Sequence, residues 1–153
     1  MTQRSLSIIG AGAWGSALAV SLSEKFDIIY LIAQDDAEVK SLSTQHDALN
    51  TPFSSNISIT ADLDNITAAE AVLIATPSYA FAEVLKKLSH YVSKQHFIAW
   101  ATKGFDTPNS CFLHETFERA LPNHAACVIS GPTFAMEIAK KKPSAIVVAF
   151  RDN

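Results

Sequence analysis

A short apolar run near the start of the chain leads into a glycine-rich turn, and a helix-like run follows. The segment reads Ser7-Ile8-Ile9-Gly10-Ala11-Gly12-Ala13-Trp14-Gly15-Ser16-Ala17-Leu18-Ala19. In this pattern Gly10 permits a tight turn, Gly12 lets a phosphate approach the backbone, and Gly15 lets the helix pack closely on the strand. The free N–H groups and the positive dipole end of the helix favour an anion. The order of strand, turn and helix predicts a dinucleotide site; a plain strand–turn–helix corner or another nucleotide-like ligand is the alternative.

The remainder of the chain alternates between short apolar runs and segments whose apolar residues have helical spacing. Strands are expected over residues 6–9, 26–32, 57–60, 70–76, 96–100, 125–129 and 145–150. Helices are expected over residues 13–24, 36–45, 79–92, 109–121 and 132–141, with a short helix or turn over 62–69 and a loop over 46–56. This alternation predicts a Rossmann-type α/β fold, which is a doubly wound, mainly parallel sheet with helices on both faces.

The composition is that of a chain that buries one sizeable core. It has 153 residues, of which 48% are hydrophobic and 18% charged, so we expect one globular domain. The net charge of −3 and the lack of a long basic run argue against nucleic acid as a partner. No apolar stretch reaches the roughly 18 residues of a membrane span, and the N-terminus does not resemble a signal peptide. We therefore expect a cytoplasmic protein.

The cysteines and histidines do not form a metal-binding pattern. Cys111 and Cys127 lie far apart, which predicts buried free thiols in a reducing compartment. No pair of histidines has the spacing of zinc ligands, so we expect no metal site. Each of the five is expected at the surface or at an edge: His46, His90, His96, His114 and His124.

Polar residues follow several of the expected strands, and in a parallel sheet ligands bind at the carboxyl ends of the strands. One such cluster is TPS over residues 76–78, and another is Gln34-Asp35. Asp35 lies 35 − 15 = 20 residues after Gly15, where a carboxylate can accept the ribose hydroxyls of NAD and would repel a 2′-phosphate. The alternative is that Asp35 only caps a helix. The absence of an arginine at this corner favours NAD weakly.

Two further clusters follow later strands. Lys103 comes just after the strand ending at Trp100, so it is expected to project into the crevice, where its charge can hold a phosphate or polarise a substrate oxygen. The alternative is a solvated loop lysine. Gly131 and Thr133 belong to a second strand–glycine–helix corner, whose N–H groups and hydroxyl suit an anion or a carboxamide. The alternative there is a capped helix with Pro132 at its first position.

Four motifs of the chain resemble those of the cofactor domain of bacterial NAD(P)-dependent glycerol-3-phosphate dehydrogenases. They are GAGAWG over residues 10–15, TPS over 76–78, ATKG over 101–104 and SGPTFAMEIA over 130–139. The resemblance spans nearly the whole chain and implies a dinucleotide-binding domain over residues 1–153. It implies hydride transfer between NAD or NADP and dihydroxyacetone phosphate, a small phosphorylated substrate, to give sn-glycerol 3-phosphate for phospholipid synthesis.

The resemblance also implies roles for single residues. Lys103 would contact both cofactor and substrate and is the catalytic candidate, while Gly131 and Thr133 would line the substrate site. Gln34 stands where the family often has a basic residue that favours NADP, so the choice between NAD and NADP stays open. The motifs and the resemblance together give the cofactor-binding residues as Gly10, Gly12, Ala13, Trp14, Gly15, Gln34, Asp35, Pro77, Lys103 and Ala135.

In the family that the chain resembles, a helical second domain follows the cofactor domain. That domain carries the proton-transfer lysine, the rest of the substrate site and much of the dimer contact, and the chain ends at Asn153 before any such region. We therefore expect a fragment that is inactive alone, from a full-length protein that forms a homodimer.

Three other functions are compatible with a glycine-rich first turn. One is another two-domain dehydrogenase, acting on a hydroxy acid or a sugar nucleotide. The second is a non-enzymatic NAD-sensing module, for which Lys103 and Thr133 would be dispensable. The third is an S-adenosylmethionine-dependent methyltransferase, which Asp35 would suit equally well but against which the second glycine corner argues.

Overall fold

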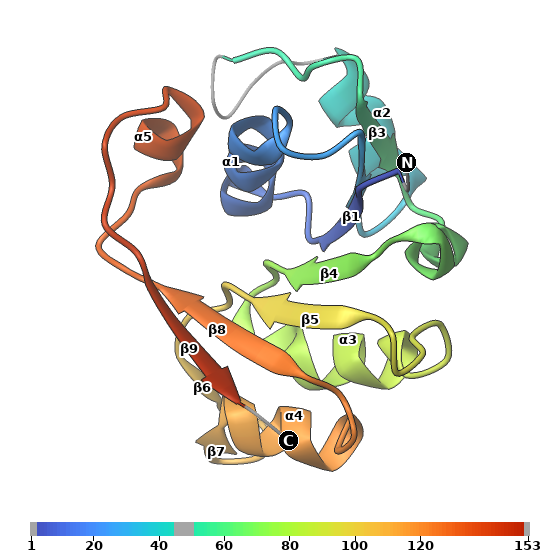
Figure 1. The fold of residues 1–153 in the computed structure, drawn as a ribbon, viewed down its shortest axis with the longest axis vertical. Coiled ribbons are helices and arrows are strands. Elements are labelled where there is room, and N and C mark those ends of the chain that lie inside the picture. Colours follow the sequence, from blue (N-terminus) through green and yellow to red (C-terminus); the bar gives the residue numbers. More distant parts are fainter. Residues whose placement is uncertain (1–2, 45–50, 152–153) are drawn as a thin grey trace.

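The computed structural model describes residues 3–44 and 51–151, and a single twisted sheet runs through its centre (Figure 1). The strands have the order β3-β2-β1-β4-β5-β8-β9. All neighbouring strands pair in parallel except β8 and β9, which are antiparallel. The predicted Rossmann-type, mainly parallel sheet is therefore confirmed. The strands are β1 (Ser5–Ile9), β2 (Ile28–Ile32), β3 (Ile57–Thr60), β4 (Ala71–Ile74), β5 (Phe97–Trp100), β8 (Ala126–Ser130) and β9 (Val147–Arg151).

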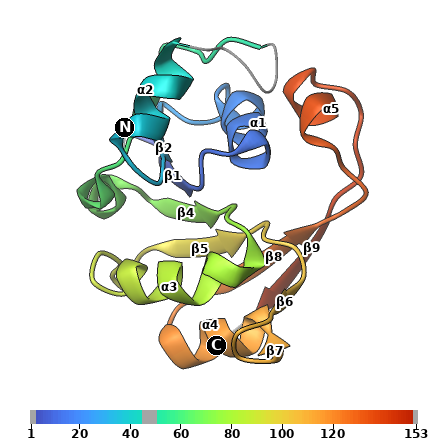
Figure 2. The ribbon, with the colours of Figure 1, turned by 180° about the vertical axis from the view of Figure 1, so that it is seen from behind.

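Helices cover both faces of the sheet, because successive residues of each buried strand point to opposite faces. Ile8, Leu31 and Leu73 belong to the core under α1 and α2, whereas the following residues Ile9, Ile32 and Ile74 belong to the core under η1, α3 and α4. Figure 2 shows α3 in front of β4 and β5, and Figure 1 shows it behind them. The helices are α1 (Ala13–Leu22), α2 (Asp36–Thr44), the 3-10 helix η1 (Leu63–Ala68), α3 (Ser78–Leu88), α4 (Leu113–Ala120) and α5 (Ala135–Ala139).

The predicted apolar face of α3 is confirmed. Phe81, Leu85 and Leu88 are fully buried. The ring of Phe81 lies 5.8 Å from that of Trp100, which stacks on Phe117 of α4 at 5.1 Å. Aromatic contacts at these distances stabilise the packing beyond the burial of their surface.

The predicted helix over 109–121 is wrong in its first turn, because a hairpin of β6 (Phe105–Asp106) and β7 (Cys111–Phe112) precedes α4. Asp106 is fully buried and accepts hydrogen bonds from Thr116 Oγ1 at 2.5 Å and Asn109 Nδ2 at 2.8 Å. Burial acts to raise the pKa of Asp106, but these hydrogen bonds and the charge of Arg119 outweigh it and lower the pKa. The ionised carboxylate of Asp106 thus stabilises the hairpin turn, and α4 begins after this hairpin, at Leu113.

Two predictions about single side chains are also wrong. His96 is buried, not at the surface: its Nε2 lies 3.2 Å from the Ile66 carbonyl oxygen, and its Nδ1 accepts from Ser93 N at 2.9 Å. Cys127 is buried as expected, but Cys111 is only half-buried, and its Sγ lies 2.8 Å from Nη2 of Arg119. His46 lies outside the described residues.

Candidate functional site

The strand order reverses between β1 and β4, and a doubly wound sheet forms its ligand crevice at this switch point. From β1 the chain proceeds to β2 and β3 on one side, and then returns to β4 and β5 on the other. The glycine-rich turn leaves the carboxyl end of β1, and residues 75–78 leave the carboxyl end of β4. Both turns are anchored to the sheet, since Gly10 N donates to the Ile32 carbonyl at 2.9 Å and Ala75 N donates to the Ile9 carbonyl at 2.8 Å.

The three glycines of the first turn meet three different requirements. Gly10 has a φ of +107°, and a Cβ built on it would lie 3.0 Å from Thr76 Cγ2. A Cβ on Gly15 would collide with the carbonyl oxygen of Gly10. A Cβ on Gly12 would meet nothing within 4 Å among the described residues, so Gly12 is not required by packing. The open space above Gly12 leaves its backbone accessible to a ligand.

Helix α1 begins without a cap. Its N-cap residue is Gly12, which has no side chain to accept from the first N–H groups, and none of its first-turn residues is acidic. The first N–H groups of a helix need an external acceptor, and an anion supplies one while it also interacts with the helix dipole. The start of α1 can therefore bind a phosphate group through its backbone.

Helix α2 begins next to this turn, and side chains of the chain itself cap its N-terminus. Asp35 Oδ1 accepts from Glu38 N at 2.8 Å, and Glu38 Oε2 accepts from Gln34 N at 2.7 Å. Asp35 therefore caps the helix, and whether that is its only role, as the alternative held, is not tested by this contact. Both Gln34 and Asp35 are exposed, and the cap uses only one of the two Asp35 oxygens, so binding of a ribose hydroxyl at the other stays a prediction.

Lys103 and Trp14 are brought together from distant parts of the chain. Lys103 follows β5, while Trp14 is the second residue of α1, and Lys103 Nζ lies 5.2 Å from the centroid of the Trp14 ring. Lys103 is exposed, and among the described residues no carboxylate pairs with it. The structure thus places the catalytic candidate beside the glycine turn with its charge available.

Several buried polar atoms near these strand ends have no hydrogen-bond partner among the described residues. They include Trp14 Nε1, Thr76 Oγ1 and Thr102 Oγ1. Because buried polar groups are nearly always hydrogen-bonded, such atoms indicate where a ligand or water supplies the partner. Thr102 was not among the predicted site residues, although its position between buried Ala101 and Lys103 at a strand end was a usable signal.

The second glycine corner differs from its prediction. Thr133 N donates to the Gly131 carbonyl at 2.9 Å, which forms a tight turn, so the helix begins at Ala135 and Pro132 is not its first residue. Thr133 is buried, and a Cβ on Gly131 would lie 2.5 Å from the Ala145 carbonyl oxygen. Since β5 and β8 are parallel neighbours, Lys103 and this corner leave the sheet at the same edge.

Comparison with known proteins agrees with this geometry. Residues 5–153 match the family described as NAD-dependent glycerol-3-phosphate dehydrogenase N-terminus. The chain belongs to this family.

Named relatives and a solved structure support the family assignment. The chain is 54% identical over 149 residues to glycerol-3-phosphate dehydrogenase (NAD(P)+) of Ruthia magnifica subsp. Calyptogena magnifica, covering 97% of this chain and 45% of that protein. It is 51% identical over 147 residues to the enzyme of Vesicomyosocius okutanii subsp. Calyptogena okutanii (strain HA), covering 96% and 45%. The crystal structure of glycerol-3-phosphate dehydrogenase from Coxiella burnetii superposes with a TM-score of 0.90 at 30% identity, covering 99% of this chain and 48% of that one. The chain therefore spans about half the length of these relatives.

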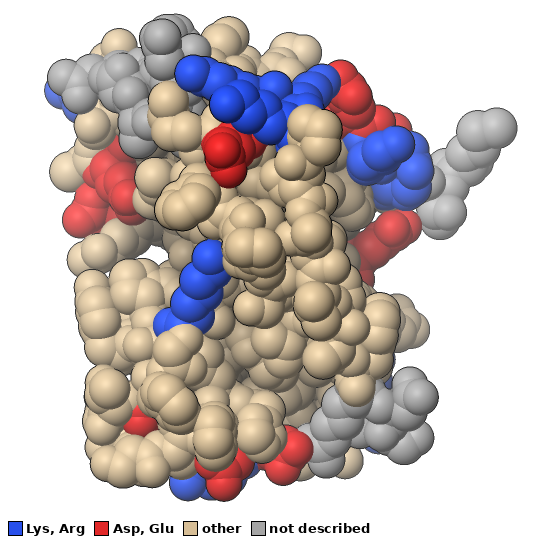
Figure 3. Space-filling view, turned by 90° about the vertical axis from the view of Figure 1, so that its left-hand side faces the viewer, with Lys and Arg blue, Asp and Glu red and all other residues tan. Residues whose placement is uncertain are grey.

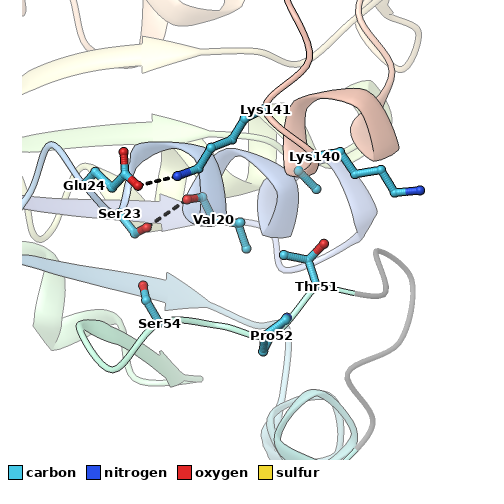
Figure 4. Close-up of a pocket in the computed structure, with 9 residues that line it drawn as sticks. Val20, Ser23, Glu24, Thr51, Pro52, Ser54, Lys140 and Lys141 are labelled. Carbon is cyan, nitrogen blue, oxygen red and sulfur yellow. Dashed lines mark hydrogen bonds and ion pairs between the residues drawn. The ribbon is translucent and has the colours of Figure 1, made fainter.

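This chain also has an open pocket of about 530 Å³ away from the glycine turn. Figure 4 shows the residues that line it. It lies beside the C-terminal end of α1 and includes Glu24, which forms an ion pair with Lys141. Val20, the first pocket residue on α1, lies 20 − 12 = 8 positions after Gly12, which corresponds to about 12 Å along the helix. The pocket is therefore distinct from the crevice at the strand ends.

The side of the molecule that carries α5 and β9 is mostly uncharged in its middle (Figure 3). Its charged side chains gather at the upper and lower ends, apart from a basic side chain in the middle. Exposed apolar residues of this part of the chain are Phe134, Met136, Ile146, Val147, Val148 and Phe150. These side chains belong to two elements, the start of α5 and the strand β9 with the segment before it.

Neither metal ligands nor a membrane span is found in the part of the chain that the structure describes. No group of three or more His, Cys, Asp or Glu side chains there could hold a metal ion. No helix there is long and apolar enough to cross a membrane.

Proposed function

We propose that this chain is the NAD(P)-binding part of a cytoplasmic sn-glycerol-3-phosphate dehydrogenase. The complete enzyme transfers a hydride between NAD or NADP and dihydroxyacetone phosphate, which gives sn-glycerol 3-phosphate for phospholipid synthesis. The observation that carries the proposal is the uncapped start of α1 at the point where the strand order reverses. The names of the relatives, glycerol-3-phosphate dehydrogenase (NAD(P)+), support it.

The cofactor is assigned to the crevice between the ends of β1 and β4. Its pyrophosphate binds the N–H groups at Gly12 and Ala13, and Trp14 borders the same turn. Its adenosine ribose extends towards Gln34 and Asp35, whose side chains are exposed. Pro77, the N-cap residue of α3, follows the end of β4, and Ala135, the first residue of α5, packs against the small cluster of Ala17 and Ala139; these two residues complete the proposed contacts.

Lys103, Gly131 and Thr133 are assigned to the substrate. The nicotinamide, when bound, supplies or accepts the hydride. The Lys103 ammonium would hold the phosphate of the substrate or offset negative charge on its oxygen, because it has no carboxylate partner among the described residues. The buried Thr133 hydroxyl and the backbone near Gly131 would orient the substrate from the neighbouring strand end.

We further propose that residues 1–153 form one dinucleotide-binding domain that acts with a second, helical domain. That domain would supply the proton-transfer lysine and much of a homodimer contact. Two observations support this arrangement: the relatives are about twice as long as this chain, and apolar side chains of α5 and β9 are exposed. The chain alone is then expected to bind dinucleotide weakly and to turn over substrate negligibly.

The experiment that tests the proposal is a calorimetric titration of this chain with NAD(H), NADP(H) and S-adenosylmethionine. We expect saturable binding of a nicotinamide dinucleotide and a loss of at least tenfold in affinity for Gly12→Val, which fills the space above the turn. Thermal unfolding of the variant checks that the fold persists, since a Cβ at Gly12 meets no described atom. Binding of S-adenosylmethionine alone, or equal dinucleotide affinity in the folded variant, contradicts the proposal.

A further inference from the structure

The contact between Lys103 and Trp14 joins two elements that the fold holds firmly. The Trp14 ring packs against the core that contains Ile8 and Leu31. The backbone before Lys103 is anchored as well, because Ala101 is buried and its N donates to the Ile74 carbonyl at 2.8 Å. The ring and the base of the lysine therefore have fixed relative positions.

The ammonium group of Lys103 is held by the ring and not by an acid. Its Nζ lies 5.2 Å from the ring centroid, within the range of a cation–π contact. Among the described residues it forms no ion pair. A free lysine side chain samples many rotamers, so this contact selects a subset of them before any ligand arrives.

We infer that Trp14 is a positioning residue that holds the Lys103 ammonium ready for a phosphate group at the strand ends. An ammonium group has three N–H donors, and a contact with the ring face leaves donors available to phosphate oxygens. Binding then orders less of the side chain than it would without the ring, which increases affinity. This inference rests on the proposed function, because it takes the anion to be the phosphate of the substrate.

The buried hydroxyl of Thr102 supports a ligand at this place independently. Thr102 is 6% exposed, and its Oγ1 has no partner among the described residues. It directly precedes Lys103 in the chain, so both residues lie at the carboxyl end of β5.

The position of Lys103 is tested by NMR of the lysine Cε–H groups in this chain. The ring current of Trp14 is expected to shift the Lys103 signals upfield, and Lys103→Met identifies them by their disappearance. Trp14→Leu should return them to the position of an exposed lysine, while Trp14→Phe should retain part of the shift. Lys86→Met, at an exposed position of α3, is the matched control and should leave the shifted signals in place. Unshifted Lys103 signals in the unaltered chain overturn the inference.

The effect on binding is tested by titration with inorganic phosphate. Trp14→Leu is expected to weaken binding by up to about two- to fivefold, because the ring can preorganise the ammonium group by no more than the strength of an exposed cation–π contact, and Trp14→Phe should restore most of the affinity. Combining Trp14→Leu with Lys103→Met should cost no more than Lys103→Met alone. Equal phosphate affinity in Trp14→Leu, or no phosphate binding by the unaltered chain, overturns the inference. Dinucleotide titration of the same samples separates the proposed dinucleotide site from the proposed role of Trp14. If the unaltered chain binds dinucleotide but its Lys103 signals are unshifted, the dinucleotide site stands and the role of Trp14 does not.

Discussion

The two glycine corners of this chain, β1–α1 and β8–α5, share the order of strand, glycine and helix but differ in structure. At the first corner α1 starts at once, runs for ten residues and packs over the sheet. At the second, a tight turn delays the helix to Ala135, and α5 has only five residues. Figure 1 shows α5 beside α1, away from the strands, and the two helices share a small core of Ala17 and Ala139. Neither helix has a side-chain cap, so the corners differ in where the helix begins and in what it packs against: only α1 starts directly after its strand and packs over the sheet.

The largest expected difference between the corners concerns their glycines. Gly15→Ala places a Cβ against the carbonyl oxygen of Gly10, a backbone atom inside the packed turn. We expect a loss of about 2–4 kcal/mol in the free energy of unfolding, measured by urea denaturation. Gly131→Ala is the matched variant, and it should cost about 1 kcal/mol because the segment it meets, residues 141–146, is exposed and lies outside any helix or strand, so it can shift. Equal losses would show that the two corners are equally rigid.

A smaller effect is expected where α5 depends on α1. Ala139 is buried against α1, so Ala139→Glu places a charge in that contact. We expect a loss of about 1–3 kcal/mol, with faster hydrogen exchange in α5 than in α1. Lys140→Glu, at the exposed neighbouring position, is the control and should stay within about 0.5 kcal/mol. If α1 exchanged as fast as α5 in this variant, the result would contradict the expectation that α5 depends on α1 but α1 does not depend on α5.

The smallest effect concerns the ion pair between Glu24 and Lys141, which connects the ends of α1 and α5 (Figure 4). The hydrogen bond and charge of Lys141 lower the pKa of Glu24 below its usual value of 4.5. A lowered pKa in the folded state means that the pair contributes stability above the usual pKa and loses it as the pH falls through the folded value. Glu24→Gln should therefore reduce stability slightly at pH 7 and match the unaltered chain near pH 2. A difference that persists at pH 2 would assign the effect to something other than this pair. Both side chains are exposed, so the change should be the smallest of the three.

The sequence predicted the sheet and the place of the glycine turn because the determining signals are local. Alternation of apolar strands and helices gave the parallel sheet, and the spacing of Gly10, Gly12 and Gly15 located the turn at the end of β1. The same reasoning missed the hairpin before α4, because the hydrogen bond from Thr116 to Asp106 joins residues ten positions apart. It also misplaced His96, whose partner Ile66 lies 30 residues away in the sequence.

The amino-acid pattern was enough to establish the order of the main-sheet strands and the helices between them, the glycine turn and the polar residues at the strand ends. Those features follow from steric limits and apolar periodicity within a few neighbouring residues. Only the folded chain decided which of these residues meet: Lys103 lies over Trp14 although they are 89 positions apart (103 − 14), whereas Asp35 is engaged as a cap. The reason is that strand order and helix packing set such distances, and both depend on contacts between segments remote in the sequence.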